Sequence, residues 1–241
     1  MKLLVIGGAG YVGAIVLPFV AARHTLRVFD RQPPAADWEY LQGDVGDLDA
    51  LVRAAAGCDA LLYMAMGDKN YATNLGITSN FDVNVKGLYL ALDAAQRVGI
   101  GHAVYASSMS VYQHNLEDRP HQAEDLPPDA SDLYGLTKRL GEEVGRNAVR
   151  AWGMSINALR LFLPMAEPDW QAFARDHTPT FATSAEDVAR AMLAALEYRD
   201  GFQAFTITGD YAQHHMHMEK ARRLLGWEPL ARPGMPGAAA V

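Results

Sequence analysis

The feature that most constrains the fold lies near the N-terminus, where a short apolar run meets a glycine-rich turn. Leu3–Ile6 is apolar without alternation, as parallel strands covered on both faces are. Gly7-Gly8-Ala9-Gly10-Tyr11-Val12-Gly13 follows directly, and Tyr11–Ala22 then has the composition of a helix. Glycines with this spacing between a strand and a helix give a tight turn, a close approach of a ligand to the backbone, and close helix–strand packing.

A second buried run, Thr25–Phe29, ends at Asp30, twenty residues after Gly10. The N-terminus of the preceding helix offers free N–H groups and a positive dipole end, which bind phosphate. A carboxylate after the second strand accepts hydrogen bonds from ribose hydroxyls and repels a 2′-phosphate. The sequence therefore predicts a dinucleotide site that takes NAD. Arg31 is interpreted as a solvated loop charge, and pairing with the 2′-phosphate of NADP stays open as the alternative.

Strands and helices continue to alternate as far as Phe162. Expected strands are Trp38–Gln42, Ala60–Met64, His102–Tyr105 and Ser155–Phe162, and expected helices are Leu48–Ala56, Asn80–Val98 and Ser131–Trp152. Loops are expected at residues 67–77 and 107–131. This rhythm predicts βαβ units and an α/β fold with a doubly wound parallel sheet.

The regular alternation of strands and helices changes after Pro164. A helix is expected at Ala185–Tyr198, a strand at Phe202–Thr208 and a short helix at His215–Leu225. We expect residues 1–164 to form the nucleotide-binding domain and residues 165–230 a small substrate lobe interleaved with it. Residues 231–241, rich in Pro, Gly and Ala, are expected to be a flexible tail.

Composition excludes several classes of protein. The 241 residues include 28 acids and 21 bases, a net charge of −7 that disfavours binding to nucleic acid phosphates. The single cysteine, Cys58, cannot form an intramolecular disulfide, and its alanine-rich surroundings predict a small core residue. No apolar run reaches the roughly 18 residues of a membrane span, and the N-terminal run is too short for a signal peptide. We expect a soluble, cytoplasmic protein without membrane or nucleic acid partners.

Three residue types after the fifth expected strand point to chemistry. Tyr134 and Lys138 are four apart and share one face of a helix. A phenol with a pKa near 10 is a weak base at neutral pH, and a nearby ammonium lowers that pKa. Ser107 and Ser108 stand where strand ends line the ligand crevice of an open α/β sheet. The combination predicts that Tyr134 takes the proton of a substrate hydroxyl while a hydride moves from the carbon that bears this hydroxyl to the nicotinamide.

Together the motifs resemble the extended short-chain dehydrogenase/reductase family, the NAD-dependent epimerases/dehydratases. The resemblance runs from Met1 to about Leu230 and includes Gly43-Asp44-Val45, Asn84-Val85-Lys86-Gly87, Val104–Tyr112, Leu159-Arg160, Glu186-Asp187-Val188-Ala189 and Leu225–Pro229. It implies a Rossmann-type fold, NAD as cofactor, and a homodimer formed through the helices expected at Asn80–Val98 and Ser131–Trp152.

The resemblance also implies roles for individual residues. Ser108, Tyr134 and Lys138 match the catalytic residues. The matching cofactor-binding residues are Gly7, Gly10, Tyr11, Val12, Gly13, Asp30, Asp44, Val45, Met64, Ala65, Met66, Asn84, Tyr134, Lys138, Phe162 and Pro164. Ser108, Met109 and Arg175 are the candidate substrate-binding residues, Arg175 because a guanidinium fork matches a carboxylate.

The segment after Pro164 bears on the substrate. Only 23 positions separate Pro164 from Asp187, where nucleotide-sugar enzymes of the family carry a longer segment, so a small substrate is expected. The abbreviated segment is similar to that of uronate dehydrogenases, which oxidise the C1 hydroxyl of a hexuronic acid to a lactone. Met109 departs from that branch, which tends to carry asparagine there.

Several functions stay open at this stage. The favoured one is an NAD-dependent oxidoreductase acting on a small hydroxylated substrate, a sugar or uronic acid. The alternatives are a nucleotide-sugar epimerase/dehydratase with tightly held NAD, and a non-catalytic NAD-binding sensor. No metal is expected, because the adjacent histidines of His214-His215-Met216-His217 cannot share a helix face and no acidic or cysteine cluster completes a site.

Overall fold

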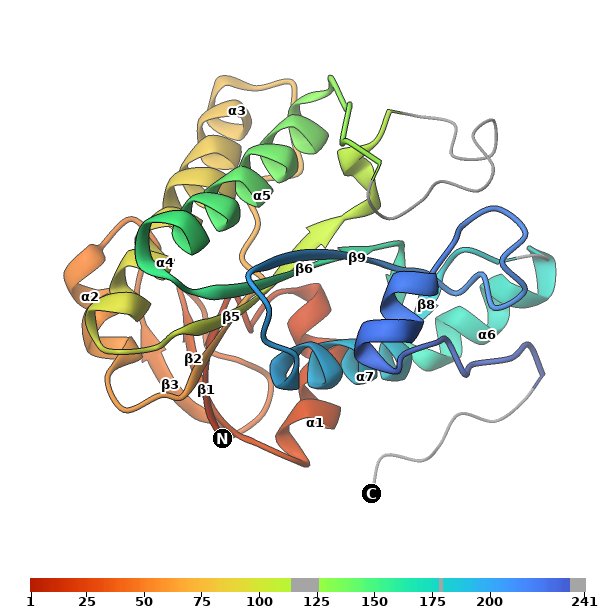
Figure 1. The fold of residues 1–241 in the computed structure, drawn as a ribbon, viewed down its shortest axis with the longest axis horizontal. Helices are drawn as coiled ribbons and strands as arrows, with labels where there is room; N and C mark the ends of the chain where they lie inside the picture. The colour runs from red at the N-terminus through yellow and green to blue at the C-terminus, as the bar shows by residue number, and fades with distance from the viewer. Residues whose placement is uncertain (114–125, 178–179, 235–241) are drawn as a thin grey trace.

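The computed structural model describes residues 1–113, 126–177 and 180–234. A parallel sheet of seven strands runs through its centre in the order β3-β2-β1-β4-β5-β6-β9 (Figure 1). The strands are β1 Lys2–Ile6, β2 Thr25–Asp30, β3 Glu39–Gln42, β4 Ala60–Tyr63, β5 His102–Ser108, β6 Ser155–Leu161 and β9 Phe202–Ile207. On one side of β1 the sheet continues through β2 to β3, and on the other side it continues through β4, β5 and β6 to β9. The α/β fold expected from the sequence is confirmed.

Helices cover both faces of the sheet. Helices α1 Tyr11–Ala21 and α7 Ala185–Glu197 lie on one face, and α2 Leu48–Ala55, α4 Leu88–Arg97 and α5 Leu133–Trp152 lie on the other (Figure 1). Leu3 and Val5 join the first core, whereas Leu4 and Ile6 join the second. Because neighbouring strand residues point to opposite faces, a strand buried on both sides must be apolar throughout.

The region before α4 differs from the prediction. Helix α3 Asn74–Phe81 begins inside the expected loop and continues into a π-helix, η1 Asp82–Gly87, before α4. Thr73 caps α3, since its hydroxyl accepts a hydrogen bond from the Gly76 N–H at 3.0 Å. Leu75 is 74% exposed, so the first turn of α3 lacks the apolar periodicity from which a helix is recognised.

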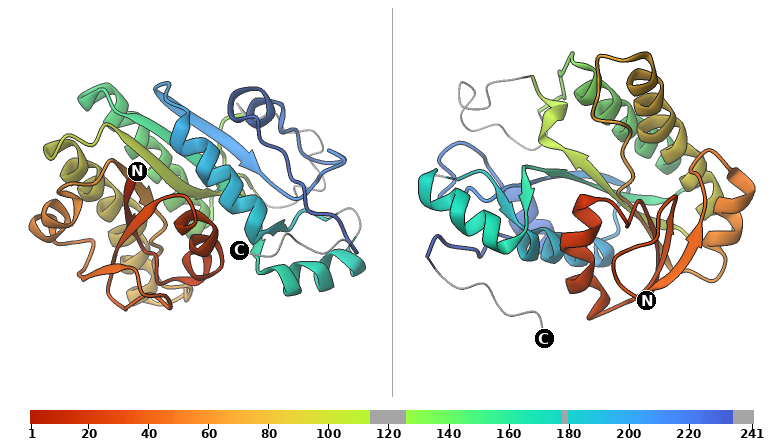
Figure 2. Two further views of the ribbon diagram at one scale, coloured as in Figure 1. Left: turned by 90° about the horizontal axis from the view of Figure 1, so that it is seen from below. Right: turned by 180° about the vertical axis from the view of Figure 1, so that it is seen from behind.

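The C-terminal part contains elements that the sequence did not reveal. Helix α6 Glu167–Asp176 stands between two short paired strands, β7 Pro164–Met165 and β8 Thr183–Ser184. It lies at the opposite end of the molecule from α2 (Figure 2). Trp170 of α6 is fully buried, and its indole Nε1 donates to the Ala182 carbonyl at 2.7 Å.

The helix predicted at His215–Leu225 is wrong in its first half. The described π-helix covers only Ala221–Leu225. Upstream of it, the buried Asp210 carboxylate accepts the backbone N–H groups of His214, His215 and Met216 at 2.8 to 3.1 Å. These amides point toward one side chain rather than along a helix axis, so the segment forms a loop.

Two motifs far apart in the sequence meet at Asp187 on α7. Its buried carboxylate accepts the N–H groups of Leu230 and Ala231, each at 2.9 Å, and its backbone carbonyl accepts from Trp227 Nε1, also at 2.9 Å. The C-terminal segment is thereby held against α7 as far as Ala231, and the Gly234 N–H donates to Gln171 of α6 at 3.0 Å. The predicted flexible tail of residues 231–241 lies outside the described residues from position 235 onward.

Candidate functional site

A cavity of about 860 Å³ lies at the carboxyl ends of the central strands, where the strand order reverses. In open α/β sheets this is the place where ligands bind. The cavity is lined by Gly7, Ala9–Gly13, Phe29–Gln32, Gly43–Val45, Met64–Lys69, Tyr71, Val83, Ala106–Ser108, Tyr134, Lys138, Leu161, Leu163 and Pro164.

The glycine loop forms a cradle at one end of this cavity. Gly7 has φ of 82°, and a Cβ there would overlap the backbone of Ala65. A Cβ on Gly13 would overlap the Gly8 carbonyl, so only glycine lets α1 approach β1 this closely. Gly10 is the N-cap of α1 and provides no side-chain cap. The first amides of α1 are therefore available to a phosphate in the cavity.

Asp30 extends the cradle from the end of β2. Its Oδ2 accepts the Ala9 N–H at 3.0 Å, and its Oδ1 accepts the Gln32 N–H at 3.2 Å. These bonds fix the carboxylate beside the glycine loop, at the position predicted for a ribose contact. Arg31, the residue after Asp30, also lines the cavity.

Ser108, Tyr134 and Lys138 meet at the other end of the cavity. Ser108 is the last residue of β5, so the strand extends into the region expected to be a loop. Asp132 caps α5 by accepting the Gly135 N–H at 2.9 Å, and the helix then carries Tyr134 and Lys138 on one face. Lys138 Nζ lies 5.7 Å from the centroid of the Tyr134 ring and donates to the Ala106 carbonyl at 2.8 Å.

The surroundings of these groups shift their pKa values. The pKa of Tyr134 is not lowered as the sequence predicted: burial raises it to about 12, and a hydrogen bond with the Ser108 side chain acts in the opposite direction. Burial lowers the pKa of Lys138 to about 8, while the negative charge of Glu142 counteracts the decrease. Near neutral pH the site therefore presents a phenol in contact with a serine hydroxyl and a buried ammonium, which suits proton exchange with a substrate oxygen.

Four of the predicted site residues do not line the cavity. Asn84 is fully buried: its Oδ1 accepts the Gly67 N–H at 3.0 Å and its Nδ2 donates to Thr137 Oγ1 at 3.0 Å. It ties the loop after β4 to the helix that carries Lys138. Met109 and Phe162 pack together in a separate apolar cluster. Arg175 is exposed on the last turn of α6, and the structure does not bring it to the cavity.

Other lining residues were not predicted, among them Lys69, Tyr71, Val83 and Leu163. Tyr71 stacks on Tyr134, with ring centroids 5.8 Å apart. Lys69, Tyr71 and Leu163 lie within eight residues of a strand end, and Val83 lies on the π-helix η1, but the sequence alone does not say which of these side chains turn inward. The available signal was their position after β4 and β6, at the edge where ligands bind.

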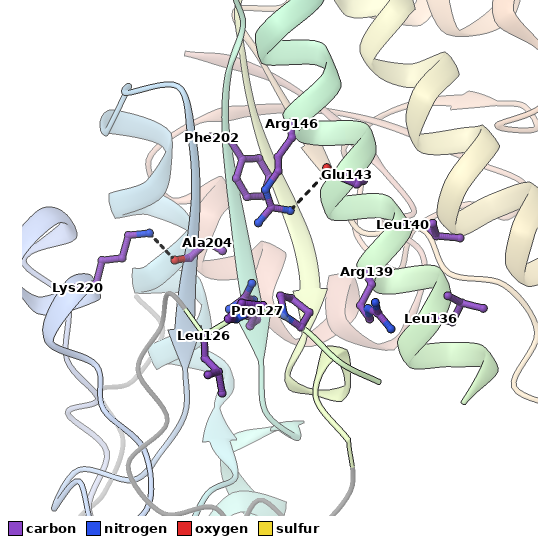
Figure 3. A pocket seen from close by; sticks show the side chains of 12 residues that line it. Leu126, Pro127, Leu136, Arg139, Leu140, Glu143, Arg146, Phe202, Ala204 and Lys220 are labelled. Carbon is purple, nitrogen blue, oxygen red and sulfur yellow. Dashed lines mark hydrogen bonds and ion pairs between the residues drawn. The ribbon is translucent and has the colours of Figure 1, made fainter. Parts of the chain in front are cut away.

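A second cavity of about 520 Å³ lies between α5 and the edge strand β9 (Figure 3). Its wall carries several cations that already have partners. Lys220 Nζ donates to the Ala204 carbonyl at 3.0 Å, and the Arg146 guanidinium lies 4.2 Å from the centroid of the Phe202 ring. Arg160 lies at the wall of this cavity, with its guanidinium turned toward the protein interior.

Residues 1–113, 126–177 and 180–234 contain no group of three His, Cys, Asp or Glu side chains placed to hold a metal ion. In the same part of the chain, every helix is too short or too polar to traverse a bilayer.

The glycine cradle, the carboxylate after β2 and the position of the cavity define a dinucleotide-binding protein of the Rossmann type. Residues 3–185 match the family model described as "NAD dependent epimerase/dehydratase family". The chain therefore belongs to this family, and NAD is its cofactor.

Curated relatives match parts of the chain. A 3 beta-hydroxysteroid dehydrogenase/Delta 5→4-isomerase of Mycobacterium tuberculosis is 40% identical over 120 residues, which cover 46% of this chain and 32% of that protein. The match thus spans about a third of the mycobacterial relative. An L-arabinose 1-dehydrogenase (NAD(P)(+)) of Haloferax volcanii is 30% identical over 172 residues, 66% of this chain and of that protein.

Solved structures share the fold over nearly the whole chain. A short-chain dehydrogenase/reductase superfamily protein from Agrobacterium tumefaciens with bound NAD has a TM-score of 0.79 and 24% identity, covering 96% of this chain and 93% of that one. A uronate dehydrogenase from the same organism has a TM-score of 0.77 and 22% identity, covering 95% and 84%. At these identities the likeness bears on the fold alone.

Proposed function

We propose that this protein is an oxidoreductase that transfers a hydride between NAD and a hydroxyl-bearing carbon of a small substrate, a sugar or uronic acid. The observation that carries the proposal is the contact between Ser108 and Tyr134 at the cavity, with the Lys138 ammonium 5.7 Å from the same ring. A serine hydroxyl, a phenol and an ammonium in one cavity are the groups that proton transfer at an alcohol needs.

In this mechanism the substrate hydroxyl lies between Ser108 and Tyr134. Ser108 orients the oxygen, and Lys138 stabilises by its charge the phenolate form of Tyr134, which removes the proton and becomes a phenol. When bound, NAD supplies the hydride acceptor. The buried position of Lys138, at 3% exposure, keeps its charge unscreened by water. In the opposite direction Tyr134 returns the proton to the carbonyl oxygen.

The same proposal assigns the cofactor contacts. The first amides of α1 bind the pyrophosphate, Asp30 binds the adenosine ribose, and Asp44 with Val45 lies beside the adenine. Lys138 holds the nicotinamide ribose as well as acting on Tyr134. Asn84 contributes from behind the cavity, through its bonds to Gly67 and Thr137.

The small size of the substrate is inferred from the segment between β7 and β8. This segment folds into α6, whose Trp170 is fully buried, so it forms a packed helix rather than an open nucleotide cradle. The resemblance to uronate dehydrogenases and the match to an arabinose dehydrogenase agree with a sugar or sugar acid. A nucleotide-sugar epimerase or dehydratase, and a non-catalytic NAD-binding sensor, are the competing functions.

The decisive experiment incubates the purified protein with NAD and, separately, pentoses, hexuronic acids, UDP-sugars and a 3β-hydroxysteroid. Accumulation of NADH with a sugar or uronic acid is the expected result. Conversion of a UDP-sugar without net NADH would instead identify an epimerase or dehydratase. NAD binding without turnover of any compound would favour the third function, a non-catalytic NAD-binding sensor.

The role of Tyr134 is tested by Tyr134→Phe, which removes the hydroxyl and keeps the ring. Because general acid–base catalysis contributes roughly a hundredfold or more, kcat is expected to fall by at least that factor. The affinity for NAD should change little, as measured by calorimetry. Tyr211→Phe, whose ring lies outside the cavity, is the matched control and should retain wild-type turnover. A Tyr134→Phe rate within about threefold of wild type would remove Tyr134 from the mechanism.

A further inference from the structure

A buried ion pair lies directly behind the proposed catalytic residues. Arg160 of β6 binds Glu142 of α5 in a bidentate manner, with Nε to Oε1 and Nη2 to Oε2 both at 2.8 Å. The side chains are 1% and 0% exposed, respectively. A buried ion pair is weak evidence for stability, because an apolar pair of similar volume is often equally stable or more so. The pair therefore calls for another explanation.

One end of the pair reaches the cofactor cavity. The Ser107 hydroxyl donates to Glu142 Oε1 at 2.9 Å, and Ser107 lines the cavity immediately before Ser108. The other end reaches the segment after Ser108, because the Arg160 guanidinium donates to the Tyr112 hydroxyl. The pair thus holds the backbone on both sides of Ser108 by charge-assisted hydrogen bonds, which are the stronger kind.

Glu142 also acts on Lys138 through its negative charge. Tyr134, Lys138 and Glu142 follow one another at intervals of four residues along one face of α5. The groups facing Lys138 are Tyr134 and Glu142 on α5 and Tyr105 on β5, whose ring centroid is 5.0 Å from Nζ. Behind Glu142 stand Arg160 and, at 3.8 Å, the Arg146 guanidinium. Among these, Glu142 supplies the negative charge that favours the ammonium form of Lys138.

We propose that Glu142 and Arg160 are positioning residues: together they fix Ser107 and Tyr112 on either side of Ser108, and Glu142 places a carboxylate about one turn along α5 from Lys138. This inference rests on the proposed roles of Ser108 and Lys138. Neither Glu142 nor Arg160 lines the cofactor cavity, and both act through neighbouring residues.

The test replaces both charges at once, as Glu142→Gln with Arg160→Met, so that neither charge is left buried alone. A melting temperature within a few degrees of wild type is expected, because an isosteric neutral pair replaces the ion pair. Turnover should fall about tenfold or more, since small misplacements of catalytic groups have large effects on rate. The pH at which NAD affinity declines should also move to a lower value, because Lys138 loses its proton more readily without Glu142.

Ser107→Ala removes the hydrogen bond to Glu142 but keeps the ion pair, so it separates the positioning of Ser108 from the effect of Glu142 on Lys138. It should lower kcat while leaving the pH dependence of NAD affinity as in wild type. The control is Glu228→Gln with Arg222→Met, which neutralises an exposed pair of 3.0 Å outside the cavity and should change neither property.

The outcomes are distinguishable from failure of the proposed function. If no substrate is turned over by wild type, the proposed function fails, but the pH dependence of NAD affinity still tests the pair. A neutralised variant with wild-type melting temperature, turnover and pH dependence would overturn the inference, as would wild-type kcat in Ser107→Ala. If the neutralised variant fails to fold, the ion pair is required for folding, and the inferred effect of Glu142 on Lys138 is wrong.

Discussion

At the scale of single residues, the site places an ammonium where water cannot solvate it. Lys138 is 3% exposed, its Nζ has one carbonyl acceptor at 2.8 Å, and its remaining surroundings include the Tyr105 and Tyr134 rings. Burial lowers its pKa from 10.5 to about 8. By linkage, a protonated Lys138 destabilises the fold by about 3 kcal/mol at neutral pH. Residues kept at such a cost are more common at functional sites than elsewhere.

Lys138→Met is therefore expected to abolish turnover and yet stabilise the protein at pH 7.5. Loss of the hydrogen bond to Ala106 removes roughly 1 kcal/mol of the gain, leaving about 2 kcal/mol. Because the folded-state pKa lies below the unfolded one, wild type binds fewer protons when folded between about pH 8 and 10.5, and its stability rises across that window. The advantage of Lys138→Met should thus shrink by pH 9.5.

Urea unfolding of both proteins at pH 7.5 and 9.5 measures this difference. Comparison within a pair of variants cancels the opposite contribution of Tyr134, whose raised pKa lowers stability only above about pH 10. Lys86→Met, at a side chain 61% exposed, is the control and should show no such pH dependence. A Lys138→Met protein that is less stable than wild type at both pH values would contradict the expected cost of burying the Lys138 ammonium.

At the scale of elements, the N-cap glycine of α1, Gly10, and a glycine in its first turn, Gly13, have separable roles. Gly10 has φ of −73°, and a Cβ there would contact only the Gly7 carbonyl, at 3.4 Å. Gly10→Ala should therefore fold normally, but its methyl group would stand where a pyrophosphate approaches, and NAD affinity should fall at least about tenfold. Gly13→Ala should instead lower stability by about 3 kcal/mol, because its Cβ overlaps the Gly8 backbone.

Calorimetry of NAD binding and thermal unfolding separate these two effects. Gly101→Ala, at a position with open space around it, is the control and should leave both quantities unchanged. Equal loss of stability in Gly10→Ala and Gly13→Ala would contradict the separate roles of Gly10 in NAD binding and Gly13 in packing.

Elements with strong apolar periodicity could be predicted from the sequence, and those without it could not. The order from β1 to β6 was predicted because each strand is buried on both faces and each helix buries one stripe. Helix α6 was missed because its burial depends on two positions, Trp170 and Ala174, in a polar segment. His215 and Met216 were predicted to start a helix, because the sequence does not show that the nearby Asp210 carboxylate binds their backbone N–H groups.

The same reasoning applies to the site. Residues at the end of a strand, such as Asp30 and Ser108, could be placed by sequence, since strand ends in a parallel sheet share one edge. Arg175 could not, because its chemistry suits a carboxylate but its position depends on how α6 packs. The Glu142–Arg160 pair joins α5 to β6 across 18 positions, and nothing in local spacing marks it.

At the scale of the whole molecule, the outer surface of α3, α4 and α5 bears the apolar side chains that a partner would cover. Phe81 is 39% exposed and Tyr89 is 42% exposed, and Tyr89 lies against Trp152 of α5 with ring centroids 5.6 Å apart. Exposed aromatic side chains gathered on adjacent helices are typical of interaction surfaces. They fall within the helices through which a homodimer is expected.

We therefore expect light scattering to give about twice the 26.3 kDa of one chain. Tyr89→Arg should yield a monomer, because a charge buried at the centre of a symmetric interface meets its own copy or apolar surface. Leu230→Glu changes a side chain that is 58% exposed on the far C-terminal segment and should leave the dimer intact. A wild-type protein that is monomeric at micromolar concentration would contradict the expectation. A Tyr89→Arg protein that stays dimeric would move the interface to another face.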